Sequence, residues 1–418
     1  MENNYYQATR RVDFSAPALD QDIETDIAIV GGGISGVSAA LHLAERGYKP
    51  VLLEAQSIGW GASGRNGGQA LAGFGASMHT ITKLVGATEA KKLWDMSVEA
   101  VDLLHERIQQ YAIPCDPQLG YLHAALKPRQ VRELREEQEE LAKLGAPVGR
   151  LLEGGALRSR LNSPRYIAAL EDKLAGHIHP LNYNLGLALA ARQAGAWLFE
   201  HSPVSRVEHG KTVTLHVGAH KVRAKYLIIA GGAYLNGLEQ KIDGYIMPVG
   251  TYIMATEPRA DVRDLIPHNE AVADVNFVLD YFRRSADDRM LFGGRVSYSK
   301  LPPPNLGAAM LRRAVAVFPQ LKDAKVEFAW GGFVDITRNR APHFGRLADN
   351  ILFLQGFSGH GLSLTGLAGK LAAEAVAGQS ERFDVFAGIP HARFPGGQLF
   401  RTPALVLATT WFRLRDML

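Results

Sequence analysis

Residues 26–54 read DIAIVGGGISGVSAALHLAERGYKPVLLE, and this stretch decides the fold. The β-branched run 26–30 predicts a strand buried on both faces. Apolar residues at helical spacing follow over 34–46, and Gly47 suits the left-handed cap that ends a helix. The run 50–53 predicts a second strand. The stretch is therefore a βαβ unit with a glycine-rich turn after its first strand.

The glycine spacing Gly31-x-Gly33-x-x-Gly36 indicates a dinucleotide site. The first glycine makes the tight turn, the second lets backbone N–H groups approach a pyrophosphate, and the third lets the helix pack on the strand. The helix N-terminus adds unsatisfied donors and a positive dipole end. Glu54 ends the second strand, where a carboxylate accepts both ribose hydroxyls of an adenosine and disfavours NADP. Three glycines alone are weak evidence, but the complete unit favours a bound dinucleotide.

The composition is that of a soluble globular protein: 418 residues, 47% apolar and 21% charged, enough for two or three domains. The net charge of +4 comes from 46 basic and 42 acidic residues without a basic arm, so nucleic acid is a poor candidate partner. The single cysteine, Cys115, excludes an internal disulfide and suits a reducing compartment. The histidines show no metal-ligand spacing, so no metal site is expected.

The two ends of the chain bear on its location. The N-terminal residues lack an apolar secretory signal, so a cytoplasmic protein is expected. The densest apolar stretch, Pro403–Phe412, is half the length of a membrane span. The segment 400–418 is apolar, aromatic and basic, which suits either peripheral membrane contact or docking on the body of the protein. The sequence does not define the oligomeric state.

The remaining periodicity predicts an α/β fold interrupted by a second sheet. Helices are expected over 88–111, 128–144 and 180–194, and the charge run 132–140 is interpreted as a solvated helix face. Aromatic-rich strands at 245–256, 275–284 and 289–298 indicate a separate antiparallel sheet. The α/β pattern returns after Trp330. The expected division is a discontinuous dinucleotide-binding domain (1–85, 150–240 and 331–390), a substrate domain (86–149 and 241–330) and a C-terminal tail (391–418).

A second glycine-rich loop, residues 59–69, favours a flavin over a nicotinamide. It carries many backbone donors and one arginine, Arg65, directly after the predicted ribose-binding acid. A flavin enzyme must cover the long ribityl chain and present donors to the isoalloxazine ring, whereas a nicotinamide enzyme has no evident need for such a loop. An ordinary exposed loop is the less favoured interpretation.

The order of these motifs resembles the D-amino-acid oxidase and glycine oxidase superfamily of flavoenzymes over nearly the whole chain. The motifs that carry the resemblance are Gly31-x-Gly33-x-x-Gly36, Glu54, Gly61–Gln69, Ala230–Gly232 and Gly356–Gly361. Within the superfamily, the chain is most similar to the γ-glutamylputrescine oxidase branch. That similarity rests on the segments Gly64–Gln69, His179–Asn182, Phe318–Asp323 and Phe394–Pro403.

The resemblance implies an FAD-binding Rossmann-like domain of the glutathione-reductase type, interleaved with an antiparallel-sheet substrate domain that meets the flavin ring. Attachment of FAD is expected to be non-covalent, since Cys115 is far from every flavin motif and loop 59–69 has no histidine. The expected FAD-binding residues are Gly31, Gly33, Ile34, Ser35, Gly36, Glu54, Ala55, Gly61, Ala62, Ser63, Arg65, Asn66, Gly67, Gly68, Gln69, Val204, Ala230, Gly231, Gly359, His360, Gly361, Leu362 and Ser363.

The activity that the resemblance implies is oxidation of a small-molecule amine. A hydride passes from the carbon beside the nitrogen to the flavin, the imine hydrolyses, and O2 or another acceptor reoxidises the flavin. Such a reaction demands no acid or base from the protein. The pocket candidates are His360, which is equally well interpreted as a packed histidine, and Tyr281 and Arg283 on the expected antiparallel sheet. Tyr252 and Phe277 are further candidates for an aromatic wall, and Arg295 is an alternative to Arg283 as a carboxylate clamp. Core packing is the more common role for each of these aromatic residues, and arginines on a sheet face are more often solvated or paired with local acids.

One departure from a relative bears on the substrate. Monomeric sarcosine oxidase follows its Gly-Phe-Ser-Gly-His-Gly segment with Phe-Lys, and that lysine holds the substrate carboxylate, whereas this chain has Leu362 and Ser363. The missing cation favours an amine whose carboxylate is remote, such as a γ-glutamylated polyamine. Two alternatives stay open: an oxidase or dehydrogenase of amino acids such as pipecolate or proline, and a flavin-binding protein without turnover.

Overall fold

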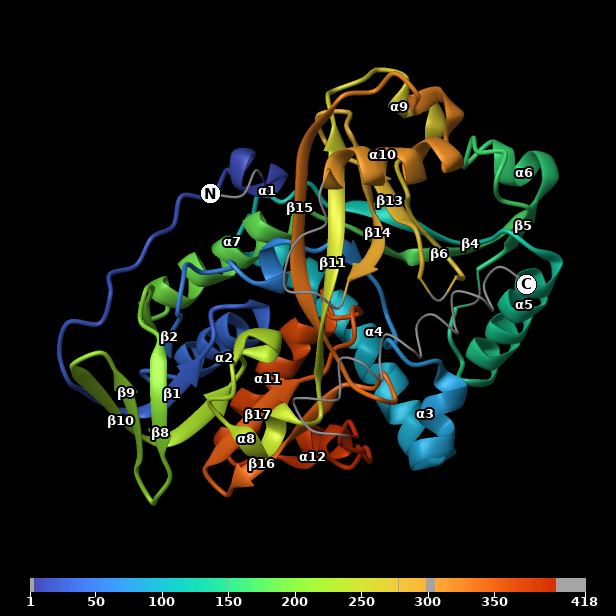
Figure 1. The fold of residues 1–418 in the computed structure, drawn as a ribbon. Helices are drawn as coiled ribbons and strands as arrows, with labels where there is room; N and C mark the ends of the chain where they lie inside the picture. The colour runs from blue at the N-terminus through green and yellow to red at the C-terminus, as the bar shows by residue number, and fades with distance from the viewer. Residues whose placement is uncertain (1–3, 148, 277, 298–304, 396–418) are drawn as a thin grey trace.

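The computed structural model describes residues 4–147, 149–276, 278–297 and 305–395, with side chains omitted at 295–297. Two β-sheets dominate it (Figure 1). The first sheet has the order β16-β17-β10-β1-β2-β7, and β8 and β9 extend it as an antiparallel pair beside β10. The strands are β1 (Ile23–Val30), β2 (Val51–Leu53), β7 (Trp197–Phe199), β8 (Val204–Glu208), β9 (Val213–Val217), β10 (His220–Ile229), β16 (His343–Ala348) and β17 (Ile351–Gln355).

The centre of the first sheet is parallel, because β17, β10, β1, β2 and β7 all run in the same direction. Its carboxyl edge therefore brings together segments from four distant parts of the sequence. Gly31 follows β1, Glu54 follows β2, Ala230 follows β10 and Gly356 follows β17. Ligands of open α/β sheets bind at this edge, so the topology assembles the motifs that the sequence displays separately.

Helix α2 (Ile34–Glu45) is the crossover between β1 and β2, and it is buried on nearly every side. It packs against α7 (Pro180–Gln193) and α11 (Leu364–Val376). A Cβ at Gly369 of α11 would lie 2.4 Å from the Ser35 carbonyl oxygen and 2.6 Å from the Ala39 nitrogen. The two helix backbones thus approach so closely that only glycine fits at Gly369.

Gly369→Ala is expected to lower the free energy of unfolding by roughly 1–3 kcal/mol, because the added methyl group forces α11 away from α2. The control is Gly366→Ala in the same helix, where the new methyl group meets nothing closer than 3.8 Å. Chemical denaturation of both variants measures the effect. Equal stabilities would contradict the close helix contact.

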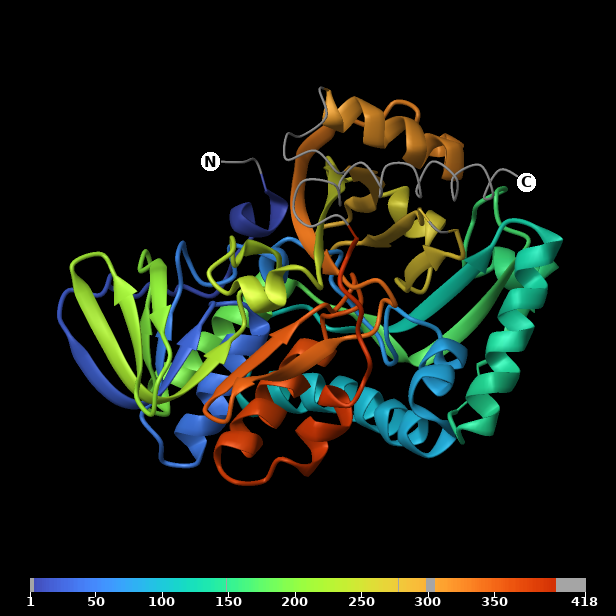
Figure 2. The same cartoon turned by 60° about the horizontal axis from the view of Figure 1, so that its bottom comes forward.

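The second sheet has the order β15-β11-β14-β13-β12-β4-β6-β3, with β5 paired to β6. Neighbouring strands run antiparallel except β4 and β12, which are parallel. In Figure 2 this sheet lies beside the α/β layer, with α5 at its outer end. The strands are β3 (Gln69–Ala70), β4 (Gln118–Ala125), β5 (Leu151–Glu153), β6 (Ala168–His177), β11 (Met247–Thr256), β12 (Ala271–Asp274), β13 (Tyr281–Arg284), β14 (Met290–Ser297) and β15 (Val326–Ile336).

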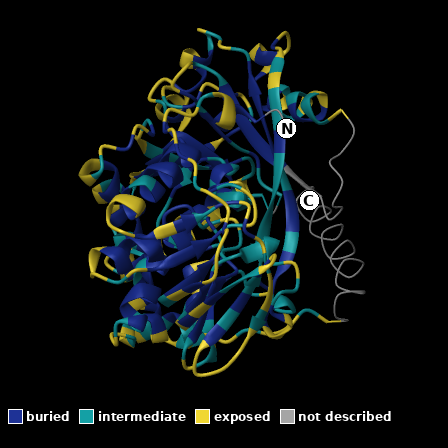
Figure 3. Ribbon diagram, turned by 90° about the vertical axis from the view of Figure 1, so that its left-hand side faces the viewer, coloured by how far each residue is buried: buried dark blue, intermediate teal, exposed yellow. Residues whose placement is uncertain are grey.

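The two faces of the second sheet have different neighbours. On one face, side chains such as Leu122, Phe282 and Phe292 form a hydrophobic cluster with α9 and α10. The intervening residues, such as His123 and Tyr281, point to the opposite face, since strand side chains alternate. Buried residues fill the interior between the layers, and exposed residues lie mainly in turns and on outer helix faces (Figure 3). The other helices are α1 (Tyr5–Ala8), α3 (Met78–Val85), α4 (Ala87–Gln110), α5 (Pro128–Lys143), α6 (Gly154–Arg158), α8 (Gln240–Asp243), α9 (Val262–Leu265), α10 (Leu306–Val317) and α12 (Glu381–Ala387).

Three expectations need correction or fall outside the description. Among the described residues of the expected strand 275–284, only Tyr281–Arg284 form a strand, β13. The segment 150–177 contributes β5 and β6 to the second sheet, although the expected division assigned it to the first domain. Strand periodicity does not reveal which sheet a strand joins. The tail from residue 396 onward lies outside the described residues. No helix among the described residues is long and apolar enough to cross a membrane.

Candidate functional site

The first glycine turn has the backbone geometry that the motif requires. Gly31 has φ +110°, and a Cβ there would lie 2.7 Å from the Ala230 carbonyl oxygen. A Cβ at Gly36 would lie only 2.0 Å from the Gly31 carbonyl oxygen, so helix α2 starts directly against the turn. The backbone N–H of Ile34 donates to Ser63 Oγ at 2.9 Å. The start of α2 is thereby joined to the second glycine-rich loop.

Glu54 lies at the end of β2 and faces the same turn. Its Oε2 accepts the Gly32 N–H at 2.6 Å, and its Oε1 accepts the Gln56 N–H at 2.8 Å. Burial raises the pKa of this carboxyl, and the two backbone donors oppose that shift. A carboxylate has further lone pairs, so these bonds leave it able to accept ribose hydroxyls. Ala55 is exposed next to it, and Val204 begins β8 two residues after Ser202, whose N–H donates to the Glu54 carbonyl.

Side chains of the second glycine-rich loop fasten it to the second sheet. Arg65 stacks on Trp60 and donates to the Gly331 carbonyl at 3.1 Å. Trp330 Nε1 donates to the Arg65 carbonyl at 3.0 Å, and Gln69 Nε2 donates to the Val272 carbonyl at 3.0 Å. Asn66 closes the turn internally. Its side-chain NH2 group donates to the Ala62 and Ser63 carbonyls, and its Oδ1 accepts the Gly68 N–H. These hydrogen bonds hold the loop in one conformation at the junction of the two sheets.

The third glycine-rich segment lies between β17 and α11. Gly356 and Gly359 have φ +77° and +82°, which favour glycine. Asp335 of β15 holds this segment, because its Oδ2 accepts the Gly356 N–H at 2.6 Å. Burial raises the pKa of the Asp335 carboxyl to about 6. The segment after β17 and the end of β15 are thus joined by this bond and by the Ser358 N–H, which donates to the Asp335 carbonyl at 3.0 Å.

His360 is anchored within this segment. Its Nε2 lies 2.9 Å from the Ala72 carbonyl oxygen, which requires a proton on Nε2. Burial lowers the pKa of His360, so the ring is neutral near pH 7. Leu362 and Ser363 are buried beside it at the start of α11, and Ser363 Oγ has no hydrogen-bond partner among the described residues. A buried hydroxyl without a partner fits the presence of a polar ligand at this helix N-terminus.

These observations test whether the residues fit an FAD molecule. The three glycine turns, Glu54 and the unpartnered Ser363 hydroxyl converge on one edge of the parallel sheet. Backbone donors at helix starts suit a pyrophosphate and the electron-rich edge of a flavin ring. The described residues include no group of three or more potential metal ligands. The donor set fits a flavin dinucleotide.

Comparison with known proteins identifies the family of the chain. The family model described as FAD dependent oxidoreductase (DAO) matches residues 26–375. The chain belongs to the DAO family of FAD-dependent oxidoreductases. It is 40% identical to the gamma-glutamylputrescine oxidoreductase of Escherichia coli, over 100% of this chain and 98% of that protein. It is also 40% identical to the probable oxidoreductase OrdL of Haemophilus influenzae, over 99% of this chain and 97% of that protein.

A solved structure supports the fold of this DAO family member. The crystal structure of glycine oxidase from Geobacillus kaustophilus matches with a TM-score of 0.73 and 20% sequence identity, covering 85% of this chain and 95% of that one. The expected α/β architecture with two interleaved sheets is therefore confirmed, as are the superfamily resemblance and the assignment as an FAD-dependent oxidoreductase. The individual site residues stay predictions.

Tyr281 lies where the two sheets meet. Its ring contacts the positions at which Gly67 and Gly293 would carry side chains, so both glycines make room for it. Burial raises the pKa of its hydroxyl, which therefore stays protonated. Tyr252 lies instead in the hydrophobic cluster with α10, on the opposite face. Of the two interpretations of Tyr252, core packing agrees with the structure, because Tyr252 shares its face of β11 with Met254, whereas Ile253 belongs to the other cluster. Phe277 and the Arg295 side chain lie outside the described residues.

Arg283 is not available as a carboxylate clamp, which corrects the sequence-based interpretation. Its guanidinium is 4% exposed and points to neutral acceptors. Nε donates to the Gly67 carbonyl at 2.7 Å, and one terminal nitrogen donates to the Ile178 carbonyl at 3.0 Å and to Tyr6 Oη at 3.2 Å. The other terminal nitrogen of Arg283 lies 3.5 Å from His177 Nδ1. Arg283 thus fastens the second glycine-rich loop to α1 and to the end of β6.

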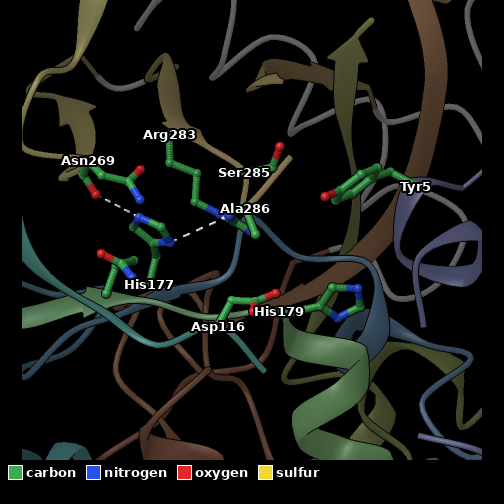
Figure 4. A pocket seen from close by; sticks show the side chains of 9 residues that line it. Tyr5, Asp116, His177, His179, Asn269, Arg283, Ser285 and Ala286 are labelled. Carbon is green, nitrogen blue, oxygen red and sulfur yellow. Dashed lines mark hydrogen bonds between the residues drawn. The ribbon is translucent and has the colours of Figure 1, made fainter. Parts of the chain in front are cut away.

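A small polar pocket adjoins this arginine (Figure 4). His177 and His179 line it, and burial lowers the pKa of each ring to about 3, so both are neutral. His177 Nε2 donates to the Asn269 carbonyl, which leaves Nδ1 facing Arg283. Asn269 Oδ1, which also lines the pocket, is buried without a hydrogen-bond partner among the described residues. The residues that line the pocket are Tyr5, Asp116, Gln118, His177, His179, Asn269, Arg283, Ser285 and Ala286.

Arg283→Lys is expected to lower the free energy of unfolding by about 2 kcal/mol, because an ammonium group cannot reach the Gly67 and Ile178 carbonyls together. The KM for amine substrates should stay within about twofold, since the guanidinium does not meet substrate. Arg284→Lys, at the neighbouring half-buried position, is the control. Chemical denaturation and steady-state kinetics measure the two effects. A raised KM with an unchanged free energy of unfolding would indicate that Arg283 does bind the substrate carboxylate.

Proposed function

We propose that the protein oxidises the terminal primary amine of a γ-glutamylated polyamine, with γ-glutamylputrescine as the leading substrate. The observation that carries this proposal is the 40% identity to the Escherichia coli gamma-glutamylputrescine oxidoreductase across both whole chains. The site is consistent with it, because Leu362 and Ser363 occupy the start of α11 without a cation for an α-carboxylate. The product after imine hydrolysis is an aldehyde.

FAD is proposed to bind without a covalent bond. The thiol of Cys115 is fully buried, and burial raises its pKa to about 12, so the nucleophilic thiolate is scarce. Loop 59–69 contains no histidine. Denaturation with acid or detergent should therefore release all the flavin from the polypeptide.

The protein's part in the reaction is orientation and exclusion of water. When bound, FAD supplies a two-electron, hydride-accepting ring. The cofactor would be held by the turns at Gly31 and Gly356 and by the loop that Arg65 fastens. Tyr281 and the neutral ring of His360 would line the interior beside it. The amine reacts as its neutral form, and no residue is assigned as a base. O2 or another acceptor completes turnover.

The decisive experiment is anaerobic mixing of the yellow protein with γ-glutamylputrescine. The visible absorbance of the oxidised flavin should disappear after γ-glutamylputrescine is added. Pipecolate, proline and glycine in parallel test the amino-acid oxidase and dehydrogenase alternative. Bleaching only by α-amino acids would favour that alternative, and bound FAD that no compound reduces would favour a flavin protein without turnover.

A further inference from the structure

A charged pair faces the interior from the outer half of the second sheet. His123 of β4 and Glu137 of α5 are joined by a contact of 3.1 Å between Nδ1 and Oε2. The neighbours of His123 on β4, Leu122 and Ala124, point into the hydrophobic cluster with α10. His123 therefore points to the opposite face of the sheet, toward the flavin-binding layer.

Helix α5 places Glu137 over this face. Val131 and Leu134 of α5 pack on Ala125 of β4 and on Ala168 and Leu170 of β6. Glu137 follows Leu134 by three residues, so it lies one turn further along the same side of the helix. The residue belongs to the charge run 132–140 that the sequence suggested was a solvated face. For Glu137 that interpretation holds only in part, because its side chain is 43% exposed and also contacts His123 of the sheet.

The pair leaves one polar atom of each partner open. His123 is 27% and Glu137 43% exposed. Within the described part of the chain, neither His123 Nε2 nor Glu137 Oε1 makes a hydrogen bond, and neither is buried without a partner. Burial opposes the charge on His123, but Glu137, Asp274 and Glu133 together raise its pKa. The pKa of Glu137 is lowered, since the attraction of His123 exceeds the cost of burial. Both groups are therefore disposed to carry charge.

The pair lies near the flavin-binding segment. The charge on His123 lowers the pKa of His360, and the charge on Glu137 raises it. His360 in turn is fixed to the Ala72 carbonyl, two residues after β3. His123 pairs with Ala273 of β12, and Ala273 pairs with Tyr281 of β13, so the ion pair lies on the same face of the second sheet as Tyr281. Tyr121, on the same face of β4, lies beside the imidazole with ring centroids 6.3 Å apart.

We propose that His123 and Glu137 bind the α-amino-acid head of the γ-glutamyl substrate. The imidazolium Nε2–H donates to the α-carboxylate, and Glu137 Oε1 accepts from the α-ammonium. A cation beside an anion matches a dipolar head better than it matches either end alone. The reacting amine must be neutral, so a carboxylate that stabilises an ammonium suits the head and not the reacting end. This proposal rests on the proposed function.

The test uses His123→Gln and Glu137→Gln in the FAD-loaded protein. Each variant should raise the KM for γ-glutamylputrescine about 10- to 100-fold, as expected for loss of a charge-assisted hydrogen bond, with kcat within about threefold. N-acetylputrescine keeps the amide and the reacting amine but lacks the dipolar head. Its anaerobic rate of flavin reduction should be the same for the wild type and both variants. Glu136→Gln, an exposed change on the same helix, is the matched control.

A binding measurement separates this proposal from the proposed function. The γ-n-butylamide of glutamate has the head but no reacting amine, and calorimetry should show 10- to 100-fold weaker binding to both variants than to the wild type. Unchanged binding and unchanged KM would overturn the role of the pair. Equal losses for γ-glutamylputrescine and N-acetylputrescine would also overturn it, as a structural effect. Tight, pair-dependent binding of the amide without flavin reduction by γ-glutamylputrescine would refute the proposed reaction and keep the subsite.

Discussion

Gly36→Ala should yield a colourless protein. The added methyl group would lie 2.0 Å from the Gly31 carbonyl oxygen, a backbone atom that cannot rotate away. Helix α2 would have to withdraw from the turn after β1, and the backbone donors that surround the pyrophosphate would move with it. We expect FAD affinity to fall by at least roughly 100-fold, equivalent to about 2.7 kcal/mol.

The measurement is the flavin content of the purified variant, followed by titration with added FAD. Gly155→Ala is the matched control, because its new methyl group meets nothing within 4 Å. A thermal unfolding transition near that of the wild-type apoprotein would confirm that the variant folds. A yellow variant with normal flavin content would show that the turn does not hold the cofactor.

Glu54→Gln should weaken FAD binding by about 10- to 100-fold, since a hydrogen bond to a charged group contributes about 1.5–3 kcal/mol. Both carboxylate oxygens already accept backbone N–H groups, from Gly32 and Gln56. A carboxamide has one oxygen, so its NH2 group would face a donor. The variant therefore loses part of the turn geometry as well as an acceptor for the ribose.

Fluorescence titration of the apoprotein with FAD measures the dissociation constant. The control is Glu24→Gln on β1, an exposed glutamate paired only with Arg223 in the described chain. NADP should bind neither protein. If Glu54→Gln binds FAD as tightly as the wild type, the ribose is held by other groups and the assignment of Glu54 fails.

The first sheet could be predicted largely from local patterns. The run 26–54 contains the strand, turn, helix and strand with bounds close to β1, α2 and β2. Such a unit is local and regular, so periodicity and glycine spacing are sufficient. The long helices α4, α5 and α7 were predicted within one residue at each end for the same reason.

The pairing of the second sheet could not be predicted in this way. Strand β4 pairs with β6 and with β12, which begins about 150 residues later in the chain, and no local pattern encodes that choice. The role of Arg283 depends on the same long-range pairing, because its acceptors at Gly67 and Ile178 come from other strands and loops. A buried arginine without a carboxylate partner has no sequence signature.

The ion pair of His123 and Glu137 carried a signal that could have been recognised. Val131, Leu134 and Leu141 form an apolar stripe on α5, and Glu137 interrupts that stripe at helical spacing. A charged residue in line with an apolar stripe lies partly against the protein. It therefore needs a partner, and a histidine on a neighbouring strand can supply one.

The strand order of the first sheet also constrains how the protein matures. Strand β1 pairs with β10 and β10 pairs with β17, so the edge that holds the nucleotide is closed only by residues near position 355. A ribosome must synthesise more than four fifths of the polypeptide before the flavin can be captured. Strand β10, the neighbour of β1, is complete at residue 229, but β17 can join it only at this later point, and such distant pairings form slowly. The supply of riboflavin, from which FAD is made, should consequently determine how much of the newly made chain escapes aggregation during expression. The reason is that FAD stabilises only the completed fold.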